Sequence, residues 1–146
     1  MPSRDDDSFD LERFVDAQER VIESVRGELR AGRKRSHWMW FVFPQLRGLG
    51  RTSTSHMYGI SSLDEAIAYL QHPILGPRLV ECTDLVNAIK GKSAEQIFGD
   101  IDAMKFRSCM TLFAKADPRN PVFTKALDEY YAGEADKLTL SLLGSG

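Results

Sequence analysis

The spacing of apolar residues predicts a helix near the start of the chain. Between residues 8 and 32 the apolar positions recur at steps of three or four residues: Phe14, Ala17, Val21, Val25 and Leu29. This period places side chains on one face of a helix. Gly32 follows the last of them and suits the residue just beyond a helix C-terminus. The pattern therefore predicts one long amphipathic helix.

Residues that favour helix starts divide the rest of the chain. A serine followed three residues later by Glu or Gln forms a capping box, and Asp, Asn and Pro also favour the first turn. These signals are, in chain order, Ser62 with Glu65, Pro73, Ser93 with Gln96, Asp100, Asn120 with Pro121, and Asp136. They mark about seven helical segments, and no segment shows the alternation of a half-buried strand. The sequence therefore predicts an all-α fold.

Residues 37–43, with the sequence HWMWFVF, are apolar on every face, so a short helix and a fully buried strand both fit. Ser36 can cap a helix and Pro44 can end it, whereas a lone strand would have no partner. We therefore favour a helix of about two turns, and the strand stays as the alternative.

Residues 44–61 form a long loop between predicted helices. The loop contains Gly48, Gly50, Gly59 and a run of hydroxyl side chains, and loops of this length in compact domains are often functional. Backbone N–H groups near glycines can hold a phosphate or a carboxylate, although the loop matches neither the P-loop nor the dinucleotide-binding pattern. We expect a single compact domain of about seven helices at residues 8–146, with this one long functional-looking loop. A disordered acidic tail is predicted at residues 1–7.

The charge balance argues against a nucleic-acid partner, because the net charge is -2 over 146 residues and only a local basic patch could support such binding. One basic cluster lies at the end of the first predicted helix: Arg26, Arg30, Arg33, Lys34 and Arg35. Cations stabilise a helix C-terminus by about 0.3 to 1 kcal/mol, which explains most of the cluster without a ligand. Beside the aromatic run, the cluster could also complete an anion site or an RNA contact.

The two cysteines, Cys82 and Cys109, are far apart and lack a histidine at ligand spacing, so neither a zinc site nor a disulfide framework is predicted. The start MPSRDDDSFD is acidic and polar, unlike a secretory signal, and no stretch reaches the ~18 apolar residues of a membrane span. We expect a soluble cytoplasmic protein with no metal, no cofactor and no membrane partner.

The predicted helix at residues 101–116 carries a cation within its apolar side. At about 100° per residue, one arc contains Ile101, Leu112, Cys109, Phe113, Phe106 and Met110, and the opposite side contains Arg107, Thr111 and Lys115. Lys105 falls inside the apolar arc and Ser108 at its edge. Because a buried, unpaired ammonium is costly, Lys105 must pair with a carboxylate, extend to solvent or bind a ligand. We expect its amine to point inward, toward the indoles of residues 37–43.

The histidines and tryptophans each have a structural and a functional interpretation. His37 and His72 are candidates for acid–base chemistry, although packing or capping of a helix would equally explain them. Trp38 and Trp40 are core residues in the simpler interpretation, and in the other they form a pocket wall that stacks a ring.

Four segments together resemble a known family: HWMWFVFPQLRGLG, YGISSLDEAIAYLQHPILGPRL, MKFRSCMTLF and the late DKLTL. The chain resembles the bacterial domain-of-unknown-function family numbered 1810 from about residue 9 to residue 143. The resemblance implies an almost entirely helical fold and supplies no activity. Some members carry the name calpastatin, but that name belongs to a disordered inhibitor and does not suit a core-rich composition. Polar positions within the family pattern are His37, Gln45, Ser53, Tyr58, His72, Arg78, Lys105 and Ser108.

Two functions remain open. In the first, the domain binds a small polar anion, nucleotide-like or ADP-ribose-like, in a pocket walled by aromatic rings. The binding residues would be Trp38, Trp40, Gln45, Arg47, Ser53, Tyr58, Arg78 and Ser108. If the ligand is hydrolysed, His37 or His72 acts as acid or base and Lys105 holds the developing negative charge. In the second, the domain is a non-enzymatic protein–protein interaction module that uses the 44–61 loop or the end at Tyr130 and Tyr131.

Overall fold

The computed structural model describes residues 7–50 and 52–144, and helices account for most of them. They are α1 (Glu12–Glu19), α2 (Ile22–Arg30), α3 (Met39–Val42), α4 (Ser53–Met57), α5 (Leu63–Gln71), α6 (Leu75–Asn87), α7 (Ala94–Phe98), α8 (Asp100–Ala116), α9 (Pro121–Tyr131) and α10 (Lys137–Gly144). Seven of the ten helices have at least seven residues. The all-α prediction is confirmed, and the only β interaction in the described part is an isolated parallel bridge between Leu46 and Ile60.

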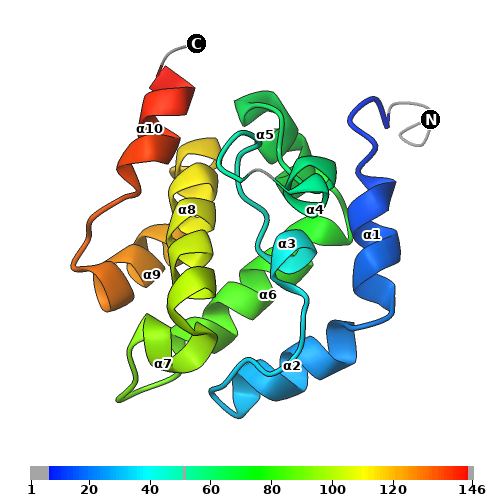
Figure 1. The fold of residues 1–146 in the computed structure, drawn as a ribbon. Helices are drawn as coiled ribbons and strands as arrows, with labels where there is room; N and C mark the ends of the chain where they lie inside the picture. Colours follow the sequence, from blue (N-terminus) through cyan, green and yellow to red (C-terminus); the bar gives the residue numbers. More distant parts are fainter. Residues whose placement is uncertain (1–6, 51, 145–146) are drawn as a thin grey trace.

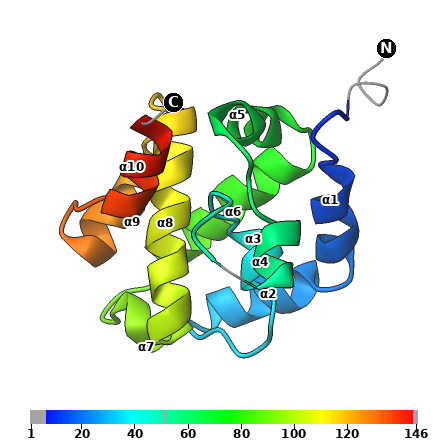
Figure 2. The same cartoon turned by 45° about the horizontal axis from the view of Figure 1, so that its top comes forward.

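The long helix α8 is the centre of the fold. It packs against α5, α7, α9 and α10, while α6 packs against α2, α5 and α9, and α1 packs against α3. Figures 1 and 2 show α9 and α10 on one side of α8 and α1 at the opposite edge of the molecule. Among the described residues no helix is both long enough and apolar enough to cross a bilayer.

Aromatic rings join the helices at the core. Phe106 of α8 lies 4.9 Å from Phe43 and 4.8 Å from Phe98, measured between ring centres, which connects α8 to α7 and to the end of α3. Tyr69 of α5 contacts both Phe14 of α1 and Phe113 of α8. These fully or nearly buried rings supply area and preferred edge geometry together.

The first helix is not continuous, so the prediction of one long helix is wrong. α1 ends at Glu19 and α2 begins at Ile22, with Val21 in a non-helical conformation. The N–H of Val21 bonds to the carbonyl of Gln18, so a tight turn preserves the three- and four-residue spacing across the break. Because α1 packs on α3 and α2 packs on α6, the turn lets the apolar face of each helix meet its own partner.

The aromatic run forms a helix, as favoured, but a shorter one than expected. α3 spans only Met39–Val42, and the residue that precedes it is Trp38 rather than Ser36. Ser36 does not cap α3, because its hydroxyl bonds to Glu28 instead. The aromatic residues flanking α3 fold inward as irregular backbone.

Most of the predicted helix starts are confirmed. Ser62 and Asn120 accept backbone N–H bonds at the starts of α5 and α9, Asp136 accepts one from Thr139 in α10, and Ser93 with Gln96 forms a complete capping box. The start of α8 differs from the prediction. Asp100, predicted to cap this helix, is already helical, and the residue that precedes α8 is Gly99, with a φ of 86°.

The start of α6 is set by a histidine rather than by the predicted proline. α6 begins at Leu75, two residues after Pro73, and Nδ1 of His72 accepts the N–H groups of Ile74 and Leu75. A ring nitrogen here satisfies backbone donors that the helix itself cannot.

The buried face of α8 differs from the predicted arc at two residues. Ile101 is 71% exposed, whereas Thr111, predicted to face outward, is 1% exposed. Thr111 is covered because its hydroxyl oxygen accepts the N–H of Asp136, just before α10. Ile101, in the first turn of α8, remains exposed to solvent.

The predicted tail at residues 1–7 falls almost wholly outside the described residues. Asp7, its last residue, is described: its carboxylate accepts the N–H groups of Leu11 and Glu12.

Candidate functional site

The inward-pointing amine of α8 lies against an indole. The Nζ of Lys105 is 3.7 Å from the centre of the Trp40 ring, and the lysine side chain is 18% exposed. A cation over the face of tryptophan gains about 0.5–2 kcal/mol, depending on how far it is desolvated. α8 therefore positions the ammonium and α3 positions the ring.

A single carboxylate holds this ammonium and a second one. Asp102 Oδ2 lies 2.8 Å from Nζ of Lys34, and Oδ1 lies 3.3 Å from Nζ of Lys105. The side chains of Lys34 and Asp102 are 8% and 19% exposed, and Lys34 also lies over the Trp38 ring at 5.2 Å. We call Lys34, Asp102, Lys105, Trp38 and Trp40 the lysine–indole cluster. Its two ammonium groups and one carboxylate leave one positive charge in excess.

Glu28 fixes the loop that carries Lys34 and Trp38 to the cluster. Its carboxylate accepts the backbone N–H groups of Arg35 and Ser36, the hydroxyl of Ser36 and the indole N–H of Trp38. Burial by itself would raise the pKa of Glu28, but these hydrogen bonds outweigh it and lower the pKa to about 2. Trp38 is only 1% exposed and its N–H is already used, so it supports the cluster from inside the core.

The prediction of a long loop at residues 44–61 is wrong in part, because α4 forms within it. This segment, for which we keep the name 44–61 loop, folds back on the cluster. The N–H of Arg47 bonds to the carbonyl of Ile60, and the N–H of Ile60 bonds to that of Gln45, which closes the loop at its base. Gly50 lies so close to Ser55 that an added Cβ would be 2.7 Å from the serine Cβ and 3.7 Å from Cη2 of Trp40. The hydroxyl of Ser55 bonds to the carbonyl of Thr52, so it is not available to cradle an anion.

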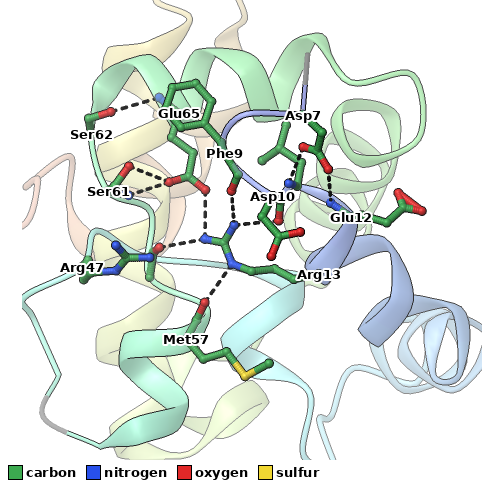
Figure 3. A network of polar contacts seen from close by, with 12 residues as sticks. Asp7, Phe9, Asp10, Glu12, Arg13, Arg47, Met57, Ser61, Ser62 and Glu65 are labelled. Atoms are coloured by element: carbon green, nitrogen blue, oxygen red, sulfur yellow. Dashed lines mark hydrogen bonds and ion pairs between the residues drawn. The ribbon is translucent and has the colours of Figure 1, made fainter. Parts of the chain in front are cut away.

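A second polar centre, around Arg13 and Glu65, was missed by the sequence analysis (Figure 3). The side chains of this pair are 10% and 2% exposed, and Nη2 of Arg13 lies 2.9 Å from Oε2 of Glu65. All five N–H groups of Arg13 have acceptors: that carboxylate and the carbonyls of Phe9, Asp10, Met57 and Gly59. The other oxygen of Glu65 accepts the N–H and the hydroxyl of Ser61.

The Arg13 centre joins α1, the end of the 44–61 loop and α5, and it leaves no donor free for a ligand. A buried, fully satisfied network of this kind makes the fold specific. The signal in the sequence is weak, because Glu65 has the third position of an ordinary capping pattern and Arg13 an ordinary place on an amphipathic helix.

Four other predicted site residues take no part in the contacts of the cluster that are given above. His37 is exposed, and His72 caps α6. Nη2 of Arg78 pairs with Glu19 at 2.7 Å, and Nε of Arg47 donates to the carbonyl of His56. Neither His37 nor His72 is hydrogen-bonded to Lys105 in the described structure.

Three further candidates have varied surroundings. Ser108, one turn after Lys105 on α8, is 6% exposed and donates to the carbonyl of Met104. The ring of Tyr58 packs on Phe41, with 5.4 Å between the ring centres, and on Phe14. Ser53 is exposed at the first turn of α4.

The surface has three hollows of several hundred Å³ that the lysine–indole cluster does not line. One of about 530 Å³ lies beside Tyr58 and Phe41 with residues of α1, one of about 670 Å³ lies along α6, and one of about 440 Å³ lies between α10 and the start of α5. A ligand at the cluster would therefore contact the exposed side of Trp40 and Lys105. The part of the chain that the structure describes contains no group of three or more His, Cys, Asp or Glu side chains that could hold a metal ion.

Comparison with known proteins agrees with the fold. The chain is similar to the crystal structure of the conserved hypothetical protein Rv1873 from Mycobacterium tuberculosis, with a TM-score of 0.92 and 60% sequence identity. The match covers 93% of this chain and 97% of that chain. Comparison with curated proteins gives no match. The family model described as "Protein of unknown function (DUF1810)" matches residues 8–143, and the chain therefore belongs to that family.

Proposed function

We propose that this protein binds a small anionic molecule that carries a flat ring, nucleotide-like or ADP-ribose-like, on the exposed side of the lysine–indole cluster. The observation that carries the proposal is the sharing of Asp102 by Lys34 and Lys105 beside Trp40, a residue that is only partly buried.

The charge arrangement favours an anion. Two unit charges about 4 Å apart interact by about 4 kcal/mol at the effective dielectric constant found near protein surfaces. Asp102 can neutralise only one of its two ammonium partners, so the remaining charge attracts an anionic group. Lys105 is the more exposed of the two lysines, and its Nζ is farther from the carboxylate. Its ammonium is therefore the group that reaches the ligand.

The indole supplies the second half of the recognition. Stacking of a base on an aromatic side chain contributes about 1–3 kcal/mol. In this proposal the ligand ring takes the place of the Lys105 ammonium on Trp40, and the ammonium moves to the anionic group. The proposal is binding without hydrolysis, because neither His37 nor His72 is hydrogen-bonded to Lys105 and Nδ1 of His72 already accepts two N–H groups.

The structure gives less support to an interaction module at the end of α9. The hydroxyl of Tyr130 donates to the carbonyls of Val86 and Ile89, and that of Tyr131 donates to the carbonyl of Ala103. Burial raises the pKa of both tyrosines. These rings hold α9 to its neighbours instead of presenting a free surface.

The test is a titration with AMP, ADP-ribose and inorganic phosphate, followed by tryptophan fluorescence and thermal unfolding. Ligand at about 100 times its Kd adds about 2.7 kcal/mol to the free energy of unfolding. Lys105→Met removes a charge-assisted hydrogen bond of about 1.5–3 kcal/mol and should weaken binding about 10- to 150-fold. Trp40→Leu should abolish the fluorescence change, because Trp38 is buried.

The matched control is Lys115→Met, which removes an exposed ammonium from the same helix and should leave affinity unchanged. Thermal unfolding without ligand shows whether each variant is folded; in Lys105→Met, Asp102 keeps its partner Lys34. Unchanged affinity in both Lys105→Met and Trp40→Leu, or the absence of binding by all three compounds, would contradict the proposal.

A further inference from the structure

We infer that the anion recognised by the lysine–indole cluster is part of a single-stranded nucleic acid, which the cationic side chains at the end of α2 hold by its phosphates. This inference rests on the proposed function and names the class of molecule that carries the ring and the anionic group. We call Arg30, Arg33, Arg35 and His37 the basic rim.

The positive charge of the three arginines in the basic rim is not compensated within the described structure. All four side chains belong to exposed residues, and none forms an ion pair with a described carboxylate. Residues 26–37 contain five lysine or arginine residues, of which Arg26 pairs with Glu23 and Glu81 and Lys34 pairs with Asp102, so the unpaired charge is that of the three arginines of the rim. Glu28 directs its oxygens toward N–H and O–H groups of the loop. The overall charge of -2 therefore conceals a local cationic surface.

The basic rim is held in place without using its cationic groups. Glu28 binds the backbone of Arg35, the N–H of Lys34 donates to the carbonyl of Ile97 at 2.8 Å, and Nζ of Lys92 donates to the carbonyl of Gly32 at 3.0 Å. The guanidinium groups thus project from a fixed backbone, which reduces the conformational entropy that binding would remove.

Inward and outward side chains alternate along this loop. Lys34 and Trp38 point into the lysine–indole cluster, whereas Arg33, Arg35 and His37 are exposed. Residues two apart are separated by at most about 7 Å along the backbone, so the guanidinium groups of Arg33 and Arg35 can reach successive phosphates of one strand.

The rim and the cluster are neighbours along the chain and are linked through Lys34. Lys34 comes from the same loop as the rim, and Asp102 joins it directly to Lys105 and hence to Trp40. A strand that follows Arg33 and Arg35 can therefore place a base on the indole. Stacking on an aromatic ring requires an unpaired base, and this combination of cations and an aromatic platform is typical of single-strand binding. A double helix would offer no free base to Trp40.

The experiment measures the affinity of the full chain for a fluorescent oligonucleotide of about eight residues, with AMP as the small-molecule reference. Three phosphate contacts, to Arg33, Arg35 and Lys105, predict a slope of about -2 for log K against log salt. Affinity should fall about 20-fold between about 50 and 200 mM salt. The double variant Arg33→Gln/Arg35→Gln keeps one contact, so the same change of salt should weaken its binding only about 2.5-fold.

The matched control, Arg119→Gln/Lys125→Gln, removes two exposed positive charges at α9 and should behave as the unmodified protein. Glu28 binds the backbone N–H of Arg35 and not its guanidinium group, so the rim variant should retain the thermal unfolding temperature of the unmodified protein. If the oligonucleotide binds no more tightly than AMP and the rim variant has no effect, the inference is overturned while the proposed function stands. Binding of a glutamate-rich peptide of equal charge with equal affinity would also overturn it, in favour of an acidic protein. Absence of binding by the oligonucleotide together with AMP, ADP-ribose and inorganic phosphate would overturn both.

Discussion

Replacement of Arg13 by methionine should destabilise the fold more than loss of any surface ion pair. The substitution leaves the Glu65 carboxylate, whose side chain is 2% exposed, with only its bonds to Ser61. It also removes donors from the carbonyls of Met57 and Gly59, which close the 44–61 loop. Removal of one partner from a buried pair costs about 3–5 kcal/mol, because the other charge stays buried without compensation.

The assay is urea denaturation followed by far-ultraviolet circular dichroism, together with thermal unfolding. For a chain of this size, 3–5 kcal/mol corresponds to a fall of roughly 6–20 °C in Tm. Arg20→Met is the control. Arg20 is an exposed arginine directly after α1, the helix that carries Arg13, and its replacement should change stability by less than about 0.5 kcal/mol. The double variant Arg13→Met/Glu65→Leu should recover part of the loss, because no charge is then buried alone. If Arg13→Met lowers the free energy of unfolding by less than about 1 kcal/mol, the Arg13 centre does not stabilise the packing of α1 against the loop and α5.

Two further predictions concern a glycine and a carboxylate. In Gly76→Ala, the new Cβ would lie 2.1 Å from the carbonyl oxygen of Leu70, so α5 and α6 must separate, and denaturation should show a loss of more than about 3 kcal/mol; Gly27→Ala, with no atom within 4 Å, should stabilise by about 0.5–1 kcal/mol. The pKa of Glu28 is about 2 in the folded protein and 4.5 as its ordinary value, so its contribution is complete above pH 4.5 and is lost as pH falls toward 2. Glu28→Gln should therefore lower stability by about 1–2 kcal/mol at neutral pH, after allowance for partial solvent screening, and the difference from the unmodified protein should disappear below about pH 2; an equal difference at every pH would contradict this origin.

The helices could be predicted because their signals are local. The capping residues Ser62, Ser93 and Asn120 act within one turn of their own helix, so a single segment contains both the donor and the acceptor. The break between α1 and α2 escaped prediction for the complementary reason. A turn at Val21 changes the direction of the chain without changing the apolar period, and only the positions of α3 and α6 decide that the direction must change.

The same distinction explains which polar residues could be found. Lys105 stands out because its neighbours on one helix are apolar, so the anomaly is visible within four residues in either direction. Arg13 does not, because three of its five acceptors lie 44 to 52 residues further along the chain, at Met57, Gly59 and Glu65. The difference lies in the range of the contacts. A cation among apolar residues of its own helix can be recognised in the sequence, whereas a cation that is bound by carbonyls from distant segments cannot.

The two polar centres consequently have different capacities for function. At Arg13 every donor has an acceptor inside the protein, so an anionic ligand could bind only by breaking contacts that hold α1 to the loop and α5. At Lys105 the carboxylate contact within the described residues is a 3.3 Å ion pair to an aspartate that also pairs with Lys34, and the ammonium also lies on the face of an indole. An anion can take the ammonium from that face while Asp102 and Lys34 stay paired. Because the ligand costs little of the native structure there, recognition is expected at the incompletely neutralised centre and stability at the satisfied one.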